Sequence, residues 1–136
     1  MIIPPPVLTY VQTSGTIQKI HPRACSLGPG EARACVAAII NAPSDIYRYT
    51  IPVDAHTPTE AEWASVLFGL TMATERSCEA IIIENKNLGI IRSLMIPRPR
   101  FRYEYACHYH NQILAQAKET AWTGVRWQNH ADTLLR

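Results

Sequence analysis

Two glutamates stand close together just before a strongly apolar run in the segment TPTEAEWASVLFGLTMA. A helix start needs only one of them. Thr57 serves as the N-cap, Pro58 takes the first helical position, and Glu60 closes a capping box. A shifted start, with Thr59 as the cap and Glu62 closing the box, obeys the same rule but leaves the proline without a role. In the first interpretation the carboxylate of Glu62 is free for other chemistry.

Small residues follow Glu62 along its own side of the predicted helix, at Ser65, Gly69 and Ala73. Small side chains let a helix approach a sheet closely, so we expect Glu62 to lie near the edge of a sheet. A carboxylate placed there needs a cation or hydrogen-bond donors. The alternative is a solvated glutamate in the first turn, favoured by the helix dipole.

A second candidate site is the segment PRPRFR, in which Arg98, Arg100 and Arg102 are spaced two apart around Phe101. Its prolines exclude a helix. Extended arginines can follow a phosphate backbone, and an aromatic ring can stack on a sugar or base. The alternative is a solvated, proline-rich connection.

The composition describes one ordinary domain of 136 residues with 47% hydrophobic content. A formal net charge of +2 does not by itself indicate nucleic acid or an anionic membrane. The four cysteines form no CxxC pair, which argues against a zinc site and predicts reduced thiols in an intracellular protein. No apolar stretch approaches the roughly 20 residues of a membrane span, so we expect no membrane association.

The hydrophobic periodicity predicts strands followed by alternating helices and strands. Residues 34–42 also fit a short helix, and residues 16–20 either continue the first strand or leave it. The order implies an α/β fold with a five-stranded mixed sheet, three antiparallel strands and then parallel additions, flanked by helices. The predicted strands are 7–15, 34–42, 46–53, 78–83 and 123–127, and the predicted helices are 58–76, 87–94, 103–121 and 130–136.

The segment TPTEAEWASVLFGLTMA resembles the first main helix of the ribonuclease H (type 1) family, whose pattern is T-x-N-x-A-E, an aromatic residue, A-x-x-x-G-L and an alanine. Thr59 stands where the family usually has asparagine. The segment QNHADTLLR is similar to the family's closing motif N-x-x-A-D-x-L-A, with one residue fewer before the alanine. The resemblance implies a single ribonuclease H-like domain over residues 1–136. The matching residues are Thr57, Ala61, Glu62, Trp63, Ala64, Gly69, Leu70, Ala73, Ala131, Asp132 and Leu134.

Members of that family cut the RNA strand of an RNA–DNA hybrid with two divalent metal ions, Mg²⁺ or Mn²⁺. Two such ions about 3.5–4 Å apart repel each other, so several carboxylates must hold them. The family takes one Asp from the first strand, one Glu from the first helix, one Asp from the fourth strand and one from the last helix. The resemblance assigns the helix glutamate to Glu62 and the last aspartate to Asp132.

The two strand ligands depart from the family pattern. Where the family reads Y-T-D-x-S-G, this chain reads YVQTSG, so Gln12 stands in the place of the metal-bridging aspartate. At the fourth strand, Glu84-Asn85 looks like the family's D-N pair, whereas counting back from the next helix places Lys86 there. Both registers remain open. If the first-strand register holds, Gln12→Asp should raise the affinity for divalent metal.

The resemblance therefore implies a ribonuclease H-like protein with an incomplete catalytic set, a pseudoenzyme that binds an RNA–DNA hybrid or duplex with weak or lost hydrolysis. It further suggests a reverse-transcriptase-related domain with a protein partner in a larger assembly. The alternatives are an active Mg²⁺- or Mn²⁺-dependent nuclease using Glu62, Glu84 and Asp132, which we take as the metal ligands, or a protein-interaction module without a cofactor. The expected catalytic positions are Gln12, Glu62, Glu84 and Asp132, and the expected nucleic-acid contacts are Ser14, Asn85, Arg98, Arg100 and Arg102.

Overall fold

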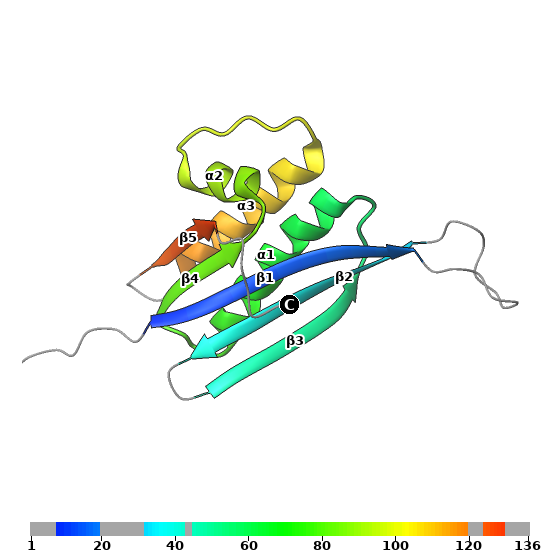
Figure 1. Cartoon of the computed structure of the whole chain (residues 1–136). Coiled ribbons are helices and arrows are strands. Elements are labelled where there is room, and N and C mark those ends of the chain that lie inside the picture. The colour runs from blue at the N-terminus through cyan, green and yellow to red at the C-terminus, as the bar shows by residue number, and fades with distance from the viewer. Residues whose placement is uncertain (1–7, 20–31, 43–44, 120–123, 130–136) are drawn as a thin grey trace, which may run out of the picture.

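The structure, a computed structural model, describes residues 8–19, 32–42, 45–119 and 124–129 (Figure 1). Its element order confirms the predicted strands and helices within these ranges. The elements are β1 (Leu8–Lys19), β2 (Ala32–Ala42), β3 (Asp45–Val53), α1 (Pro58–Glu75), β4 (Ala80–Asn85), α2 (Leu88–Met95), α3 (Glu104–Glu119) and β5 (Val125–Asn129). The predicted closing helical segment 130–136 lies outside the described residues.

The five strands form one mixed sheet in the order β3-β2-β1-β4-β5. β1 pairs antiparallel with β2, and β2 pairs antiparallel with β3. On its other side β1 pairs in parallel with β4, which pairs in parallel with β5. The predicted α/β class and mixed topology are thus confirmed, and β1 occupies the middle of the sheet.

The strands differ from their predicted bounds for identifiable local reasons. β1 continues to Lys19, so residues 16–19 extend the strand. β4 begins two residues later than predicted because the preceding residues complete the end of α1: Ser77 adopts a positive φ of 58°, and the N–H of Cys78 bonds to the carbonyl of Ala73 at 3.2 Å. β5 also starts two residues late, after Gly124 at a φ of +78°.

The start of α1 confirms the first of the two capping interpretations. Thr57 is extended at a φ of −131°, and its side chain accepts the N–H of Glu60 at 3.1 Å, with Pro58 in the first turn. Glu60 reaches back to the N–H of His56 at 3.2 Å, one residue earlier than a standard capping box requires. Glu62 therefore takes no part in capping.

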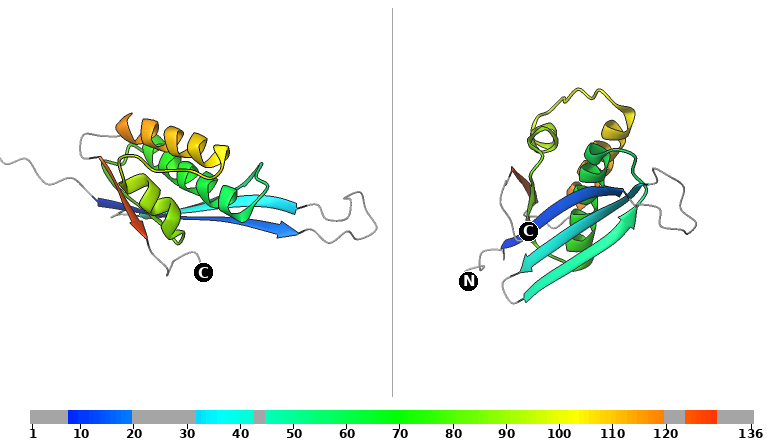
Figure 2. Two further views of the ribbon diagram at one scale, coloured as in Figure 1. Left: turned by 90° about the horizontal axis from the view of Figure 1, so that it is seen from above. Right: turned by 45° about the vertical axis from the view of Figure 1, so that its right-hand side comes forward.

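The helices α1 and α3 lie on one face of the sheet, with α1 directly on the strands (Figure 2). Buried apolar side chains of β1, β2 and β4 meet those of the two helices there, among them Val11, Ile40, Ile83, Leu70 and Ile113. Trp63 is buried in this core, as the helix periodicity predicts. The described helices include no stretch long and apolar enough to cross a membrane.

Candidate nucleic-acid and metal-binding site

The two faces of β1 carry different chemistry. A Cβ added at Gly69 of α1 would lie 2.4 Å from Cγ2 of Thr13 and 3.0 Å from Cγ1 of Val11, so these two side chains face the helix. Successive side chains of a strand point to opposite faces of the sheet. Gln12 and Ser14 therefore point to the face away from α1.

Glu84 lies beside Gln12 on that far face, because β1 and β4 pair these two residues directly. Nε2 of Gln12 donates to Oε2 of Glu84 at 3.2 Å, and Nε2 of Gln128 in β5 donates to Oε1 at 3.2 Å. The glutamate is only 7% exposed. Both carboxylate oxygens of Glu84 are thus occupied by neutral amides rather than directed at Glu62.

Asn85 binds within the protein. Its Nδ2 donates to Oγ1 of Thr13 at 2.9 Å and to Oγ of Ser65 at 3.3 Å, and its Oδ1 accepts the N–H of Asn87 at 2.8 Å. The side chain is 1% exposed. It ties β4 to β1, to α1 and to Asn87, the N-cap of α2, so this side chain is not available to a nucleic acid.

Glu62 reaches the edge of the sheet from α1, as the row of small residues predicts. The N–H of Gly15 donates to its Oε1. A Cβ at Gly15 would lie 2.0 Å from the carbonyl oxygen of Ala61, so only glycine permits this close approach. Oε2 has no hydrogen-bond partner among the described residues, although Glu62 is only 5% exposed. Burial raises the pKa of Glu62, while the Gly15 N–H, the charge of Lys86 and the side-chain amide of Asn85 act to lower it.

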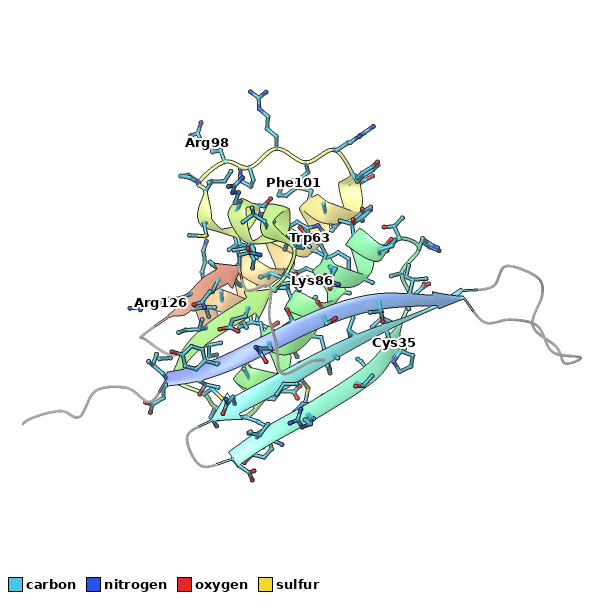
Figure 3. The ribbon with its side chains drawn as sticks, in the orientation of Figure 1. Cys35, Trp63, Lys86, Arg98, Phe101 and Arg126 are labelled. Carbon is cyan, nitrogen blue, oxygen red and sulfur yellow. The ribbon has the colours of Figure 1, made fainter. Side chains whose placement is uncertain are left out.

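Lys86 follows directly after the last residue of β4 and is exposed (Figure 3). Its carbonyl oxygen accepts a hydrogen bond from Nδ2 of Asn129 at 3.1 Å, which fixes the backbone at this point. The pairing between the parallel strands ends with Thr13 and Asn85, and Lys86 lies in the bend that follows.

The predicted metal ligands do not gather into one cluster in the described part of the chain. Gln12 and Glu84 lie together on the far face, Glu62 lies at the contact between β1 and α1, and Asp132 is outside the described residues. No group of three or more His, Cys, Asp or Glu side chains able to hold a metal occurs among the described residues. The described members of the donor set do not by themselves form a two-metal centre.

The arginine segment forms a strap, residues 96–103, that connects α2 to α3 (Figure 1). Its side chains alternate: Arg98, Arg100 and Arg102 are exposed, whereas Pro99 and Phe101 are half-buried. Figure 3 shows Arg98 directed away from the body of the protein and Phe101 directed toward it.

Phe101 holds the strap to the helices. Its ring lies 4.9 Å from that of His110 in α3 and 6.0 Å from that of Trp63 in α1, measured between centroids. Phe101, which could stack on a sugar or base, packs instead on His110 and Trp63 within the protein. Gly15 and Gln128 were not among the expected site residues; they lie in strands that pair with β4 on its two sides.

No family model and no curated protein matches this sequence. Solved structures do match its fold. RNase H1 from the halophilic archaeon Halobacterium salinarum NRC-1 superposes with a TM-score of 0.71 at 11% identity, covering 90% of this chain and 85% of that one. LC11-RNase H1, solved in complex with an RNA/DNA hybrid, gives 0.62 at 12% identity, covering 90% and 84%. The prototype foamy virus protease-reverse transcriptase gives 0.65 at 14% identity, covering 96% of this chain and 18% of that one.

The topology and these superpositions define the chain as a ribonuclease H-like fold, which confirms the resemblance at the level of the fold. At 11–14% identity the likeness concerns the fold alone. What the chain binds and whether it cuts must be argued from its own residues.

Proposed function

We propose that this protein binds nucleic acid, an RNA–DNA hybrid or a related duplex, without two-metal hydrolysis. The observation that carries the proposal is the strap, which presents Arg98, Arg100 and Arg102 to solvent on a segment fixed by Phe101. Alternate residues of an extended chain are about 6.5–7 Å apart, so three such arginines can contact successive phosphates of one strand. LC11-RNase H1, which shares the fold, has been solved with a hybrid, and this supports the same class of ligand.

Loss of hydrolysis rests on the two described carboxylates of the candidate set. Both oxygens of Glu84 accept amide hydrogens, and Glu62 lies elsewhere, against Gly15. A pair of dications needs several negative ligands around both ions. In this set Glu62 has one oxygen without a hydrogen-bond donor among the described residues, Gln12 has a neutral amide, and Lys86 has a positive charge. Because too few negative ligands remain for two dications, the set supports a pseudoenzyme.

Binding of a labelled RNA–DNA hybrid across a salt series tests the proposal. Each phosphate contact contributes a slope of about −0.9 to the dependence of log K on log salt for B-form DNA. We expect the triple variant Arg98→Ala, Arg100→Ala, Arg102→Ala to lose affinity and to lower that slope by about 2 to 3. Arg48→Ala, at an exposed position of the edge strand β3, is the matched control and should change little.

Two results contradict the proposal. If the wild-type protein shows no salt-dependent binding of hybrid or duplex, the chain is better explained as a protein-interaction module that retains the fold. If the strap variant and Arg48→Ala have equal effects, the binding is nonspecific attraction to positive charge and the strap has no particular role.

A second candidate is an active nuclease that uses Glu62, Glu84 and Asp132 with Mg²⁺ or Mn²⁺. The observation in its favour is the buried Oε2 of Glu62, which has no partner among the described residues and is a potential metal ligand. Cleavage of a labelled hybrid in either metal, lost on Glu62→Gln, would support this candidate over the first.

We further propose that the domain acts within a larger assembly of the reverse-transcriptase type. The superposition on the foamy virus protein, of which this chain spans 18%, supports this setting. Co-purification of the natural protein with a polymerase subunit tests it, and purification as an isolated monomer contradicts it.

A further inference from the structure

The buried carboxylate of Glu62 needs a positive partner that its hydrogen bond from Gly15 does not supply. Oε1 accepts the N–H of Gly15, while Oε2 has no hydrogen-bond partner among the described residues. Burying part of a carboxylate without compensation costs free energy, and a nearby cation lowers that cost. The question is which group supplies the positive charge.

The structure places one cationic residue at this edge. Lys86 comes directly after β4, whose last residue, Asn85, bonds to Ser65 one turn beyond Glu62 on α1. The side chain of Asn129 holds the carbonyl of Lys86, so the backbone at this position is fixed from β5. The positive charge of Lys86 also lowers the pKa of Glu62, against the larger effect of burial.

We propose that Lys86 supplies, beside Glu62, the positive charge that a divalent metal supplies in ribonucleases H. The inference extends the proposed function, on which its nucleic-acid part rests. The ammonium compensates the carboxylate and offers its remaining donors to a phosphate of the bound strand. This edge then contacts nucleic acid with no divalent cation present.

A lysine and a metal ion exclude each other at such a site. A lysine ammonium and a dication drawn to the same carboxylate repel each other, so each lowers the occupancy of the other. Replacing Lys86 by a carboxylate removes this repulsion and adds a second negative ligand next to the open Oε2 of Glu62. The exchange should therefore create a divalent-cation site where the described residues of the natural chain form none.

The test is a calorimetric titration of the full chain with Mn²⁺ in the absence of nucleic acid. We expect no tight binding to the wild-type protein and an affinity for Lys86→Asp higher by at least about tenfold. The double variant Lys86→Asp, Glu62→Gln should lose the gain. Lys118→Asp is the matched control, because Lys118 is exposed in α3. It lies two residues after Gln116, which accepts a hydrogen bond from Thr71 at 3.0 Å. Thr71 is in the last part of α1, whereas Glu62 is in its first part.

The variant Lys86→Ala gives a second test, which does not introduce a carboxylate as a metal ligand. It should weaken hybrid binding in EDTA several-fold, and adding Mg²⁺ should partly restore the loss. Tight Mn²⁺ binding by the wild-type protein overturns the inference, as does equal Mn²⁺ affinity in Lys86→Asp and Lys118→Asp. Since the manganese titration contains no nucleic acid, its failure is separate from failure of the proposed function, which the salt series measures.

Discussion

The backbone N–H of Gly15 in β1 donates a hydrogen bond to Oε1 of Glu62 in α1, and this contact joins the central strand to the first helix. The same approach leaves no room for a side chain at position 15, because a Cβ there would lie 2.0 Å from the carbonyl oxygen of Ala61. The position of Glu62, and with it the candidate site, thus depends on one glycine.

Gly15→Ala should therefore destabilise the protein. The added methyl group meets backbone rather than a flexible side chain, so the helix must shift, and we expect a loss of at least about 2 kcal/mol in the free energy of unfolding. Urea denaturation measures it. Gly89→Ala, in α2, is the control: its Cβ would meet only the end of the Asn87 side chain, at 3.3 Å, so a change below about 1 kcal/mol is expected. Equal losses in the two variants would contradict the close-approach argument.

The buried Glu62 should make stability depend on pH in a particular direction. Burial raises its pKa above the ordinary value of 4.5. A carboxyl whose pKa is raised on folding stabilises the fold while it is protonated, below that ordinary value. The contribution is lost as pH rises through the raised pKa. The free energy of unfolding of the wild-type protein should thus fall relative to that of Glu62→Gln as pH rises from about 4 to about 8.

The control for that titration is Glu119→Gln, at an exposed position of α3. The difference in the free energy of unfolding between Glu119→Gln and the wild-type protein should vary less with pH. If the free energies of unfolding of Glu62→Gln and the wild-type protein differ by the same amount across this pH range, the carboxyl of Glu62 is not buried as described.

Gln12→Asp tests the first-strand register that the resemblance implies. In the structure Gln12 donates to Glu84, so an aspartate there replaces a donor with a like charge. We expect a loss of about 1–3 kcal/mol in stability at neutral pH, relieved at acid pH. Thr16→Asp, exposed on the same face of β1, is the control and should cost less. If Gln12→Asp instead binds Mn²⁺ in a manner that requires Glu62, the first-strand register of the resemblance is correct and Lys86 is not the metal's replacement.

Phe101→Ala tests whether the strap is preformed. The substitution removes no charge, yet it removes the ring that packs on His110 and Trp63. Ordering a loosened strap on binding costs conformational entropy, so hybrid affinity should fall by about threefold to tenfold. Met95→Ala, at an exposed position at the end of α2, should leave affinity unchanged. Unchanged affinity in Phe101→Ala would show that the arginines need no anchor.

The helix that carries Glu62 was predictable from local signals. A threonine cap, a proline in the first turn and a glutamate three residues after the cap fix its start. The line of small residues after Glu62 correctly predicted its contact with the sheet. These features depend on neighbouring residues, which is why the sequence suffices for them.

The arrangement of the strand residues was not predictable in the same way. The alternation of side chains predicts which residues share a face of a strand. It does not say whether Gln12 or Ser14 lies at the same height along the strand as Glu62. That height is set by the pairing of β1 with β4 and by the approach of α1 at Gly15. The partners of Glu84 are likewise remote in sequence, 72 residues away for Gln12 and 44 for Gln128. Only the assembled sheet brings them together.

We propose above all that this ribonuclease H-like fold binds nucleic acid without cutting it through two metals. The most direct measurement incubates a labelled RNA–DNA hybrid with the full chain in EDTA, in Mg²⁺ and in Mn²⁺, and records binding and cleavage in the same samples. We predict salt-dependent binding in EDTA and intact RNA under all three conditions. Metal-dependent cleavage of the RNA strand that disappears in Glu62→Gln would contradict it.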